Sequence, residues 1–323
     1  MSSPDTSRDI QAERAALGDM GDFGIIGCGA VGGTLARALV ASGASVASVA
    51  ARHLEHAEAL AAHIPGCRAL ASAEEVAASS RLVVLAVPDD TIMPLAQRIP
   101  WSARQWVLHL SGAIGARALA SAAERGAAVA ALHPLMTFTR GLVESPIEEI
   151  LTRLRGCVWA LETDDEALRG ALEEMVTALG GRIAYLGAGD RIPYHISGVL
   201  ASNYVVTLIG AAVALWESFG ADAQLAREAL LPLLRASVEN LGVMEPPAAL
   251  SGPIARGDVG TLRAHLDWLS SAARTSAEMR ALRDAYVAMA RLTLPLAEAK
   301  GTVTPERAAA MRHLLDNAQT TGE

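Results

Sequence analysis

The chain has 323 residues, enough for two domains, and its 27 basic and 35 acidic residues give a net charge of −8. The basic residues form no cluster of the kind that binds nucleic acid, so the expected partners are small molecules. Three cysteines stand far apart without a CxxC or Cys/His spacing, which predicts no disulfide framework and no metal site and fits a cytoplasmic protein. Residues 1–20 are polar and read as a loose extension or a short helix without the apolar core of a signal peptide.

The next segment joins an apolar run, a glycine-rich turn and an amphipathic helical pattern. Phe23–Gly43 reads FGIIGCGAVGGTLARALVASG, and a second strand is expected over Ser45–Ala50. This βαβ context predicts a Rossmann turn, in which the glycines permit a tight bend, an open backbone and a close helix contact, while the helix N-terminus faces a pyrophosphate. The cofactor-binding positions predicted in this turn are Gly27, Cys28, Gly29, Ala30, Val31 and Gly32.

The residues after the second strand indicate which dinucleotide binds. An NAD site expects an acidic residue there for the ribose hydroxyls, whereas this chain has Ala50 and Ala51 followed by Arg52 and His53. No carboxylate would repel a 2′-phosphate, and Arg52 can form charge-assisted hydrogen bonds to it with help from His53. The predicted cofactor is therefore NADP(H).

Further apolar runs extend the predicted sheet to about residue 187, and a long helical region follows. After Asp190 the pattern changes to alanine- and leucine-rich helices with breaks at Gly220, Pro246 and Gly301. The fold class predicted is α/β, a Rossmann-type doubly wound sheet over 21–189 followed by an all-helical domain over 190–323. The sheet elements expected after the first two strands are strands at 81–87, 105–110, 127–132, 157–161 and 182–186, and a helix at 166–179.

One helix in the second domain has the length of a membrane span. Ile196–Trp216 contains no charged residue, yet it holds polar residues such as Asn203 and Thr207 that are costly in lipid. We expect a helix buried by neighbouring helices or by a partner subunit, and no membrane contact.

Ligands of doubly wound sheets bind at the carboxyl ends of the strands, which directs attention to the residues that follow each strand. Val87 and Pro88 follow one strand, and Ser111 and Gly112 follow the next; these four are expected beside the cofactor. His133, after a further strand, would lie where a substrate arrives. Ser111 as an ordinary turn residue and His133 as a structural hydrogen-bonding group are alternatives that the sequence leaves open.

Reduction of a carbonyl or imine also needs a proton donor near the heteroatom. The chain's only lysine is Lys300, near the C-terminus, which leaves His195 and Tyr194 at the start of the helix, and His195 is the leading candidate. On an ideal helix Ser202 lies within about 20° of His195 and Asn203 about 80° away. Asn203 is thus predicted to orient the carbonyl oxygen, although a purely structural role for either residue remains an alternative.

A loop rich in glycine and proline, LSGPIARGD, supplies the last candidate. Arg256 in this loop has a guanidinium suited to a substrate carboxylate, and an ion pair with an acid such as Asp258 is the alternative. Asp258 itself is predicted to cap the following helix.

In order along the chain, GxGxxG, LAVPDDTI, HLSGA, ALHPLMTF, YHxxxxxASNY and SGPIARGD form a specific combination over about residues 22–290. It resembles bacterial Rossmann-like oxidoreductases with a helical C-terminal domain of formerly unknown function. That family includes an alternative ketopantoate reductase that uses NADPH, and it is distantly similar to pyrroline-carboxylate reductases and prephenate dehydrogenases.

The resemblance implies an NADP(H)-dependent oxidoreductase that forms a dimer through its helical domain. Prephenate dehydrogenases carry a catalytic histidine in a His-Pro motif, which His133-Pro134 matches, whereas the lysine of ordinary ketopantoate reductases is missing here. The leading hypothesis is NADPH-dependent reduction of a small, anionic 2-oxo acid such as ketopantoate, with His195 as proton donor. An imine reductase or a prephenate-type dehydrogenase that uses His133 is the second hypothesis, and a redox sensor that binds NADP(H) is the third.

Overall fold

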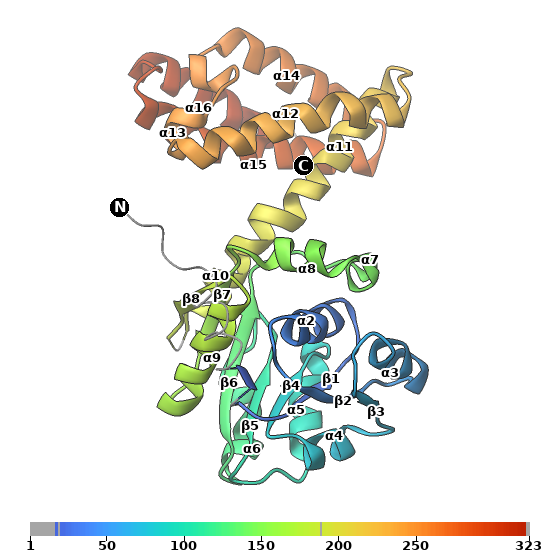
Figure 1. Cartoon of the computed structure of the whole chain (residues 1–323). Coiled ribbons are helices and arrows are strands. Elements are labelled where there is room, and N and C mark those ends of the chain that lie inside the picture. The colour runs from blue at the N-terminus through green and yellow to red at the C-terminus, as the bar shows by residue number, and fades with distance from the viewer. Residues whose placement is uncertain (1–16, 19, 188, 321–323) are drawn as a thin grey trace, which may run out of the picture. The chain divides into compact units, whose positions relative to one another are not determined.

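A computed structural model of the chain describes residues 17–18, 20–187 and 189–320, so most of the expected extension over 1–20 lies outside the described residues. Internal contacts divide the chain into two units, which meet between Asn203 and Tyr204 (Figure 1). We call them the N-terminal unit and the C-terminal unit. The division falls within the helical stretch that the sequence assigns wholly to a second domain starting at residue 190.

The N-terminal unit is built on an eight-stranded sheet in the order β3-β2-β1-β4-β5-β6-β7-β8. Neighbouring strands are parallel except for β6 and β7, which run antiparallel. The doubly wound fold class predicted from the sequence is confirmed. The strands are β1 Phe23–Ile26, β2 Val46–Ala50, β3 Arg68–Ala69, β4 Leu82–Leu85, β5 Trp106–His109, β6 Ala128–Pro134, β7 Val158–Glu162 and β8 Arg182–Tyr185.

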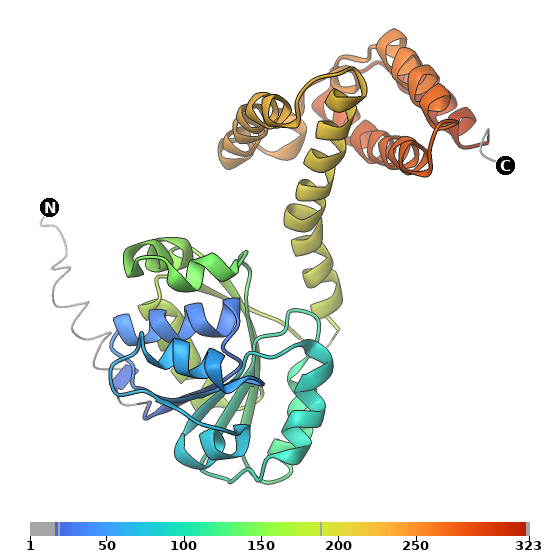
Figure 2. The same cartoon turned by 90° about the vertical axis from the view of Figure 1, so that its right-hand side faces the viewer.

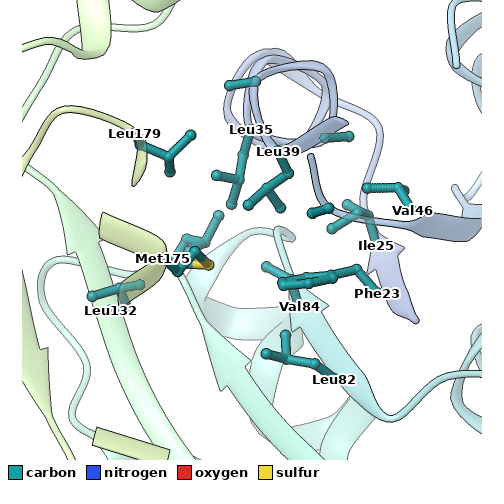
Figure 3. Close-up of a cluster of buried hydrophobic side chains, with 14 of the residues drawn as sticks. Phe23, Ile25, Leu35, Leu39, Val46, Leu82, Val84, Leu132, Met175 and Leu179 are labelled. Carbon is teal, nitrogen blue, oxygen red and sulfur yellow. The ribbon is translucent and has the colours of Figure 1, made fainter. Parts of the chain in front are cut away.

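Helices cover both faces of this sheet (Figure 1). The central strands β1, β4 and β5 are buried on both sides, because alternate side chains of each of them enter different apolar clusters. In β1, Ile25 packs with Leu35 and Leu39 of α2 (Figure 3), whereas Ile26 belongs to the cluster on the other face. The helical elements of this unit are α2 Ala30–Ala41, α3 Leu54–Ala61, α4 Ala73–Ser79, α5 Asp89–Arg98, η1 Ala116–Leu119, α6 Ala120–Ala123, α7 Arg140–Glu144, α8 Ile147–Leu154, α9 Glu166–Ala178, α10 Arg191–Gly198 and the π-helical η2 Val199–Asn203.

The reversal between β6 and β7 departs from an all-parallel sheet. The two short helices α7 and α8 fill the connection and lie against α2, where the guanidinium of Arg37 donates to the carbonyls of Val143 and Ser145. After this connection the chain runs along β7 in the direction opposite to β6, which makes the two strands antiparallel. β7, α9 and β8 then form the parallel βαβ unit that the sequence predicts.

The C-terminal unit is all-helical, as predicted. Its breaks fall where the sequence places them: Gly220 has φ +88°, Pro246 is the first residue of α13, and Gly301 caps α15 in the left-handed region with φ +75°. Helices α14, α15 and α16 pack against one another (Figure 2). Their inward-facing residues form a common apolar cluster. The elements are α11 Tyr204–Ser218, α12 Ala223–Val243, α13 Pro246–Ala249, η3 Ile254–Arg256, α14 Val259–Ala272, α15 Ala277–Lys300 and α16 Pro305–Thr320.

The expected central helix over Ile196–Trp216 differs from the prediction in two ways. A π-helical turn at Val199–Asn203 interrupts it, and neither that turn nor α11 contains a buried residue, so helices of the same chain do not bury it. The stretch Arg191–Ser218, with 28 residues and a mean hydropathy of 1.8, has the length and composition of a membrane span, and none of that apolar window is buried. Of the two predicted ways to bury this helix, burial by other helices of the chain does not occur among the described residues. Burial by a partner subunit stays a prediction.

Candidate functional site

The turn after β1 has the shape of a dinucleotide-binding loop. Gly27 has φ +110°, and a Cβ added there would lie 2.2 Å from the carbonyl oxygen of Ala86, so only glycine fits. A Cβ at Gly32 would lie 2.0 Å from the carbonyl oxygen of Gly27, which explains how closely α2 approaches the sheet. A Cβ at Gly29 would meet nothing within 4 Å. The turn is thus tight at two glycines and open at the third.

The other predicted positions in this turn contribute either backbone hydrogen-bond donors or a buried side chain. Gly29 is the N-cap of α2 and supplies no side-chain cap, so the helix N-terminus at Ala30 and Val31 presents backbone donors toward the open side. Cys28 is half-buried, with Sγ 3.5 Å from the carbonyl oxygen of Ala50. Burial, and secondarily Cys67, raises the pKa of the Cys28 thiol to about 12, so the thiol stays protonated and acts as an apolar filler.

Two of the remaining predicted cofactor positions follow β2, and two follow β4. Arg52 and His53 are exposed directly after β2, and the backbone of His53 caps α3. Val87 is half-buried after β4, and Pro88 is the N-cap of α5. All four lie at the carboxyl ends of their strands, the edge at which Rossmann folds bind ligands.

The segment after β5 is a tight turn with a structural hydrogen-bond network. The hydroxyl of Ser111 accepts hydrogen bonds from the backbone N–H groups of Ala113 (3.2 Å) and Ile114 (3.1 Å). Nδ1 of the buried His109 accepts from the N–H of Ser111 at 3.2 Å, so Nε2 carries the ring proton and donates to the carbonyl of Gly115 at 3.1 Å. Ser111 therefore shapes this turn, as the simpler sequence interpretation holds, and His109 was missed.

Gly112, in this turn, lies between the two predicted histidines. A Cβ added at Gly112 would lie 2.9 Å from Nε2 of His133 and 2.9 Å from Cδ2 of His195. The two imidazole rings are 6.3 Å apart between centroids, with planes at 83°. The structure thus brings together three residues that the sequence predicts separately: Gly112 after β5, His133 near the end of β6 and His195 on α10.

His133 is held in its neutral form. Burial, followed by the charges of His195 and Arg191, lowers its pKa to about 4, and Asp89 opposes this shift. Nδ1 of His133 lies 2.7 Å from the hydroxyl of Tyr194, whose own pKa is raised to about 12, mainly by burial. At neutral pH His133 therefore carries one ring proton, and Tyr194 is a neutral hydrogen-bond partner.

The last two predicted site residues, Asn203 and Arg256, stand apart from the contacts described so far. Asn203 is exposed at the end of the π-helical turn, so the ideal-helix angle of 100° per residue does not describe its direction relative to His195. Arg256 belongs to the C-terminal unit, where its side chain is exposed and its carbonyl accepts a hydrogen bond from Arg307. Asp258 caps α14 through Thr261, as predicted.

Sequence reasoning missed an ion pair close to the Gly112 turn. Arg191 and Glu162 form that pair at 2.5 Å. Burial of a charge follows from tertiary packing, so the sequence carried no direct signal for it. The single lysine is structural: Lys300 Nζ donates to the carbonyls of Ala248 (3.1 Å) and Leu250 (2.7 Å).

Comparisons with protein families support the motif-based resemblance. Residues 1–134 match the Rossmann-like domain model, and residues 157–293 match the model described as a domain of unknown function, DUF2520. A comparison with curated proteins found no match.

Solved structures share the fold over most of the chain. A protein from Bacteroides fragilis has a TM-score of 0.67 at 18% identity, covering 85% of this chain and 98% of that chain. A reductive aminase from Aspergillus terreus, in complex with NADPH and ethyl levulinate, has a TM-score of 0.55 at 20% identity over 94% of both chains. A 1-pyrroline-5-carboxylate reductase from Streptococcus pyogenes has a TM-score of 0.56 at 14% identity, covering 93% of this chain and 98% of that chain.

Proposed function

Because the chain carries a Rossmann-like domain followed by a DUF2520 domain, we propose that it is an NADPH-dependent reductase of a small 2-oxo acid, with ketopantoate as the candidate substrate. The observation that carries this proposal is the meeting of His133 and His195 at Gly112, on the edge of the sheet where Rossmann folds bind ligands. The structural neighbours that contain NADPH support the choice of cofactor.

The glycine turn fits the cofactor. The cradle at Gly29 is open, and the uncapped N-terminus of α2 presents donors for a pyrophosphate. Arg52 and His53 are exposed where a 2′-phosphate is expected, and the segment from Ala50 to His53 holds no acid to repel it. NADPH, when bound here, supplies a hydride to the carbonyl carbon of the substrate.

Gly29→Ala tests this cradle. The backbone of Gly29 has φ −80°, which any residue adopts, so we expect unchanged thermal stability. The added methyl group would stand where the pyrophosphate approaches, and NADPH affinity should fall about tenfold or more, which corresponds to about 1.4 kcal/mol. Fluorescence titration with NADPH measures the affinity. Gly27→Ala is the contrasting variant: the strain and the overlap with Ala86 should cost about 3 kcal/mol of folding stability.

In the proposed reaction His195 donates the proton that the carbonyl oxygen takes up as the hydride arrives. The neutral His133 lacks a second ring proton to give, because its pKa is lowered to about 4, and it orients the substrate oxygen by hydrogen bonding instead. We propose that Asn203 fixes the same oxygen and that Arg256 binds the substrate carboxylate. The product is then a 2-hydroxy acid.

A second function is favoured by the fold comparisons. Several of the structural neighbours are imine reductases, reductive aminases or pyrroline-carboxylate reductases, so the acceptor double bond in this site can be C=N instead of C=O. In that case, or in a prephenate-type dehydrogenase, His133 would take the acid-base role.

The deciding experiment follows NADPH absorbance and fluorescence with the purified protein before and after addition of 2-ketopantoate. Oxidation that depends on ketopantoate, and that is faster with NADPH than with NADH, is the expected result. Binding of NADPH without oxidation would reject ketopantoate and direct the assay to other oxo acids and to cyclic imines. Failure to bind either nucleotide would overturn the proposal as a whole.

We also propose that the protein is a cytoplasmic homodimer whose interface lies on the helical unit. Helices α11 and α12 pack against each other and expose large apolar side chains, among them Val206 (73% exposed), Leu233 (66%) and Val243 (80%). A surface of this kind marks a protein interface. By light scattering, the wild type is expected at twice the chain mass of 33.6 kDa and Val206→Asp at the mass of one chain. Ser271→Asp, at an exposed polar position of α14, should leave the dimer intact.

A further inference from the structure

We propose that the ion pair of buried Arg191 and half-buried Glu162 is a positioning element for the reaction: it fixes both ends of the turn that contains Gly112 and the start of the helix that carries His195. This inference rests on the proposed function for its catalytic meaning. The contacts on which it depends lie wholly within the N-terminal unit.

The guanidinium of Arg191 connects β7, β6 and the turn that follows β5. Nε donates to Oε2 of Glu162 at 2.5 Å, Nη1 to the carbonyl of Ser111 at 3.0 Å, and Nη2 to the carbonyl of Ala131 at 2.8 Å. Ala131 and Glu162 are also register partners in the antiparallel pair of β6 and β7. With only 4% of Arg191 exposed, the side chain is committed to the protein and not offered to a ligand.

Glu162 holds the opposite end of the same turn. Its Oε1 accepts from the backbone N–H of Ala116 at 3.1 Å, where η1 begins. A Cβ at Gly115 would lie 2.8 Å from that oxygen, so the carboxylate packs directly against Gly115. Arg191 therefore fixes the turn at Ser111 and Glu162 fixes it at Ala116, with Gly112 between them.

The pair also positions two side chains of the proposed site. Arg191 is the first residue of α10, and Tyr194 and His195 stand three and four residues later, on the same side of the helix. Tyr194 reaches Nδ1 of His133, and His195 approaches Gly112. Loosening of Arg191 would shift both side chains together relative to the turn.

The charge of Arg191 has a second effect. The charged and titratable groups that face His133 are Arg191, Tyr194 and His195 from α10 and Asp89 from α5; Arg191 and His195 lower its pKa, and Asp89 raises it. Removal of the guanidinium charge should therefore raise the pKa of His133, whereas a lysine that keeps the charge should hold it low. Comparing these two variants therefore separates the effect of the Arg191 charge on the pKa of His133 from the effect of its hydrogen bonds on the position of the turn.

The test compares Arg191→Lys with Arg191→Met. For Arg191→Lys we expect kcat to fall about 100-fold, NADPH affinity to change little, and the pKa of His133 from NMR titration to stay low. For Arg191→Met the pKa of His133 should rise as well. Arg283→Lys is the matched control, because Arg283 is also a buried arginine (8% exposed) paired with an acid, Asp284, but in the C-terminal unit. Its kcat should be unchanged.

If Arg191→Lys folds and retains kcat within about twofold of the wild type, the positioning role is wrong. Should both arginine variants fail to fold, Glu162→Gln preserves shape and removes one charge, and it is expected to lower kcat and to move the Gly112 amide resonance. That resonance and the His133 titration need no turnover. If the wild type shows no reductase activity, the proposed function is wrong. The Gly112 resonance and the His133 titration would still show whether the ion pair holds the turn in place.

Discussion

Replacement of His195 by glutamine is expected to lower kcat by about 10²–10⁴-fold, the usual contribution of a positioned general acid, while NADPH still binds. Glutamine keeps a hydrogen-bonding side chain of similar length but has no proton to transfer. His195 lies against the Gly112 turn, where its ring would face a substrate bound at the edge of the sheet. Stopped-flow measurement of NADPH oxidation, with NADPH affinity measured separately, gives both quantities.

His133→Gln is the comparison that makes this prediction decisive. Since burial and neighbouring charges hold the pKa of His133 at about 4, we expect this variant to lose activity mainly through substrate orientation, with a smaller decrease in kcat. The reverse order, in which His133→Gln abolishes turnover and His195→Gln retains it, would reject His195 as the donor. It would favour the imine reductase or prephenate-type alternative.

Gly112→Ala is expected to lower kcat about 100-fold with a much smaller effect on NADPH binding. The new methyl group would lie 2.9 Å from both His133 and His195, so one or both rings must move, and displacements of about 1 Å cost about this much in rate. The variant should still fold, because the rings can rotate away. Gly141→Ala on α7 meets nothing within 4 Å and serves as the control with wild-type kinetics.

A crystal structure of Gly112→Ala would show which ring moves. If kcat stays at the wild-type value although the rings have shifted, then neither histidine acts at this position. That outcome would move the search for the proton donor to Tyr194, whose hydroxyl contacts His133.

The centre of the sheet was predictable because strands such as β4 are buried on both faces and read as continuous apolar runs, here Leu82–Leu85. The glycine turn was predictable because steric demands at Gly27 and Gly32 leave no other residue. β3 was not predicted, since Arg68–Ala69 is too short to show a period. The reversal at β7 was not predicted either, since strand direction depends on how α7 and α8 pack.

Some residues of the candidate site could also be predicted from the sequence, and others could not. His133 and Gly112 could be predicted because residues at the carboxyl ends of parallel strands converge at one edge, and His195 because the helix that follows begins there. Arg191 and Glu162 were missed: nothing in a sequence distinguishes an arginine that is 4% exposed from one in solvent. The π-helical turn at Val199–Asn203 was also invisible, and it removes the ideal periodicity on which the position assigned to Asn203 depended.

The scarcity of lysine has a consequence for the chemical durability of the protein. Oxo compounds condense with unprotonated amines to form adducts, and a chain with many lysines would be modified whenever such compounds accumulate. Here Lys300 is the only side-chain amine, and two backbone carbonyls hold its ammonium group. The arginines that supply nearly all the positive charge do not form such imines at neutral pH, because the guanidinium stays protonated. A protein of this composition therefore offers a single side-chain amine, that of Lys300, for imine formation with oxo compounds.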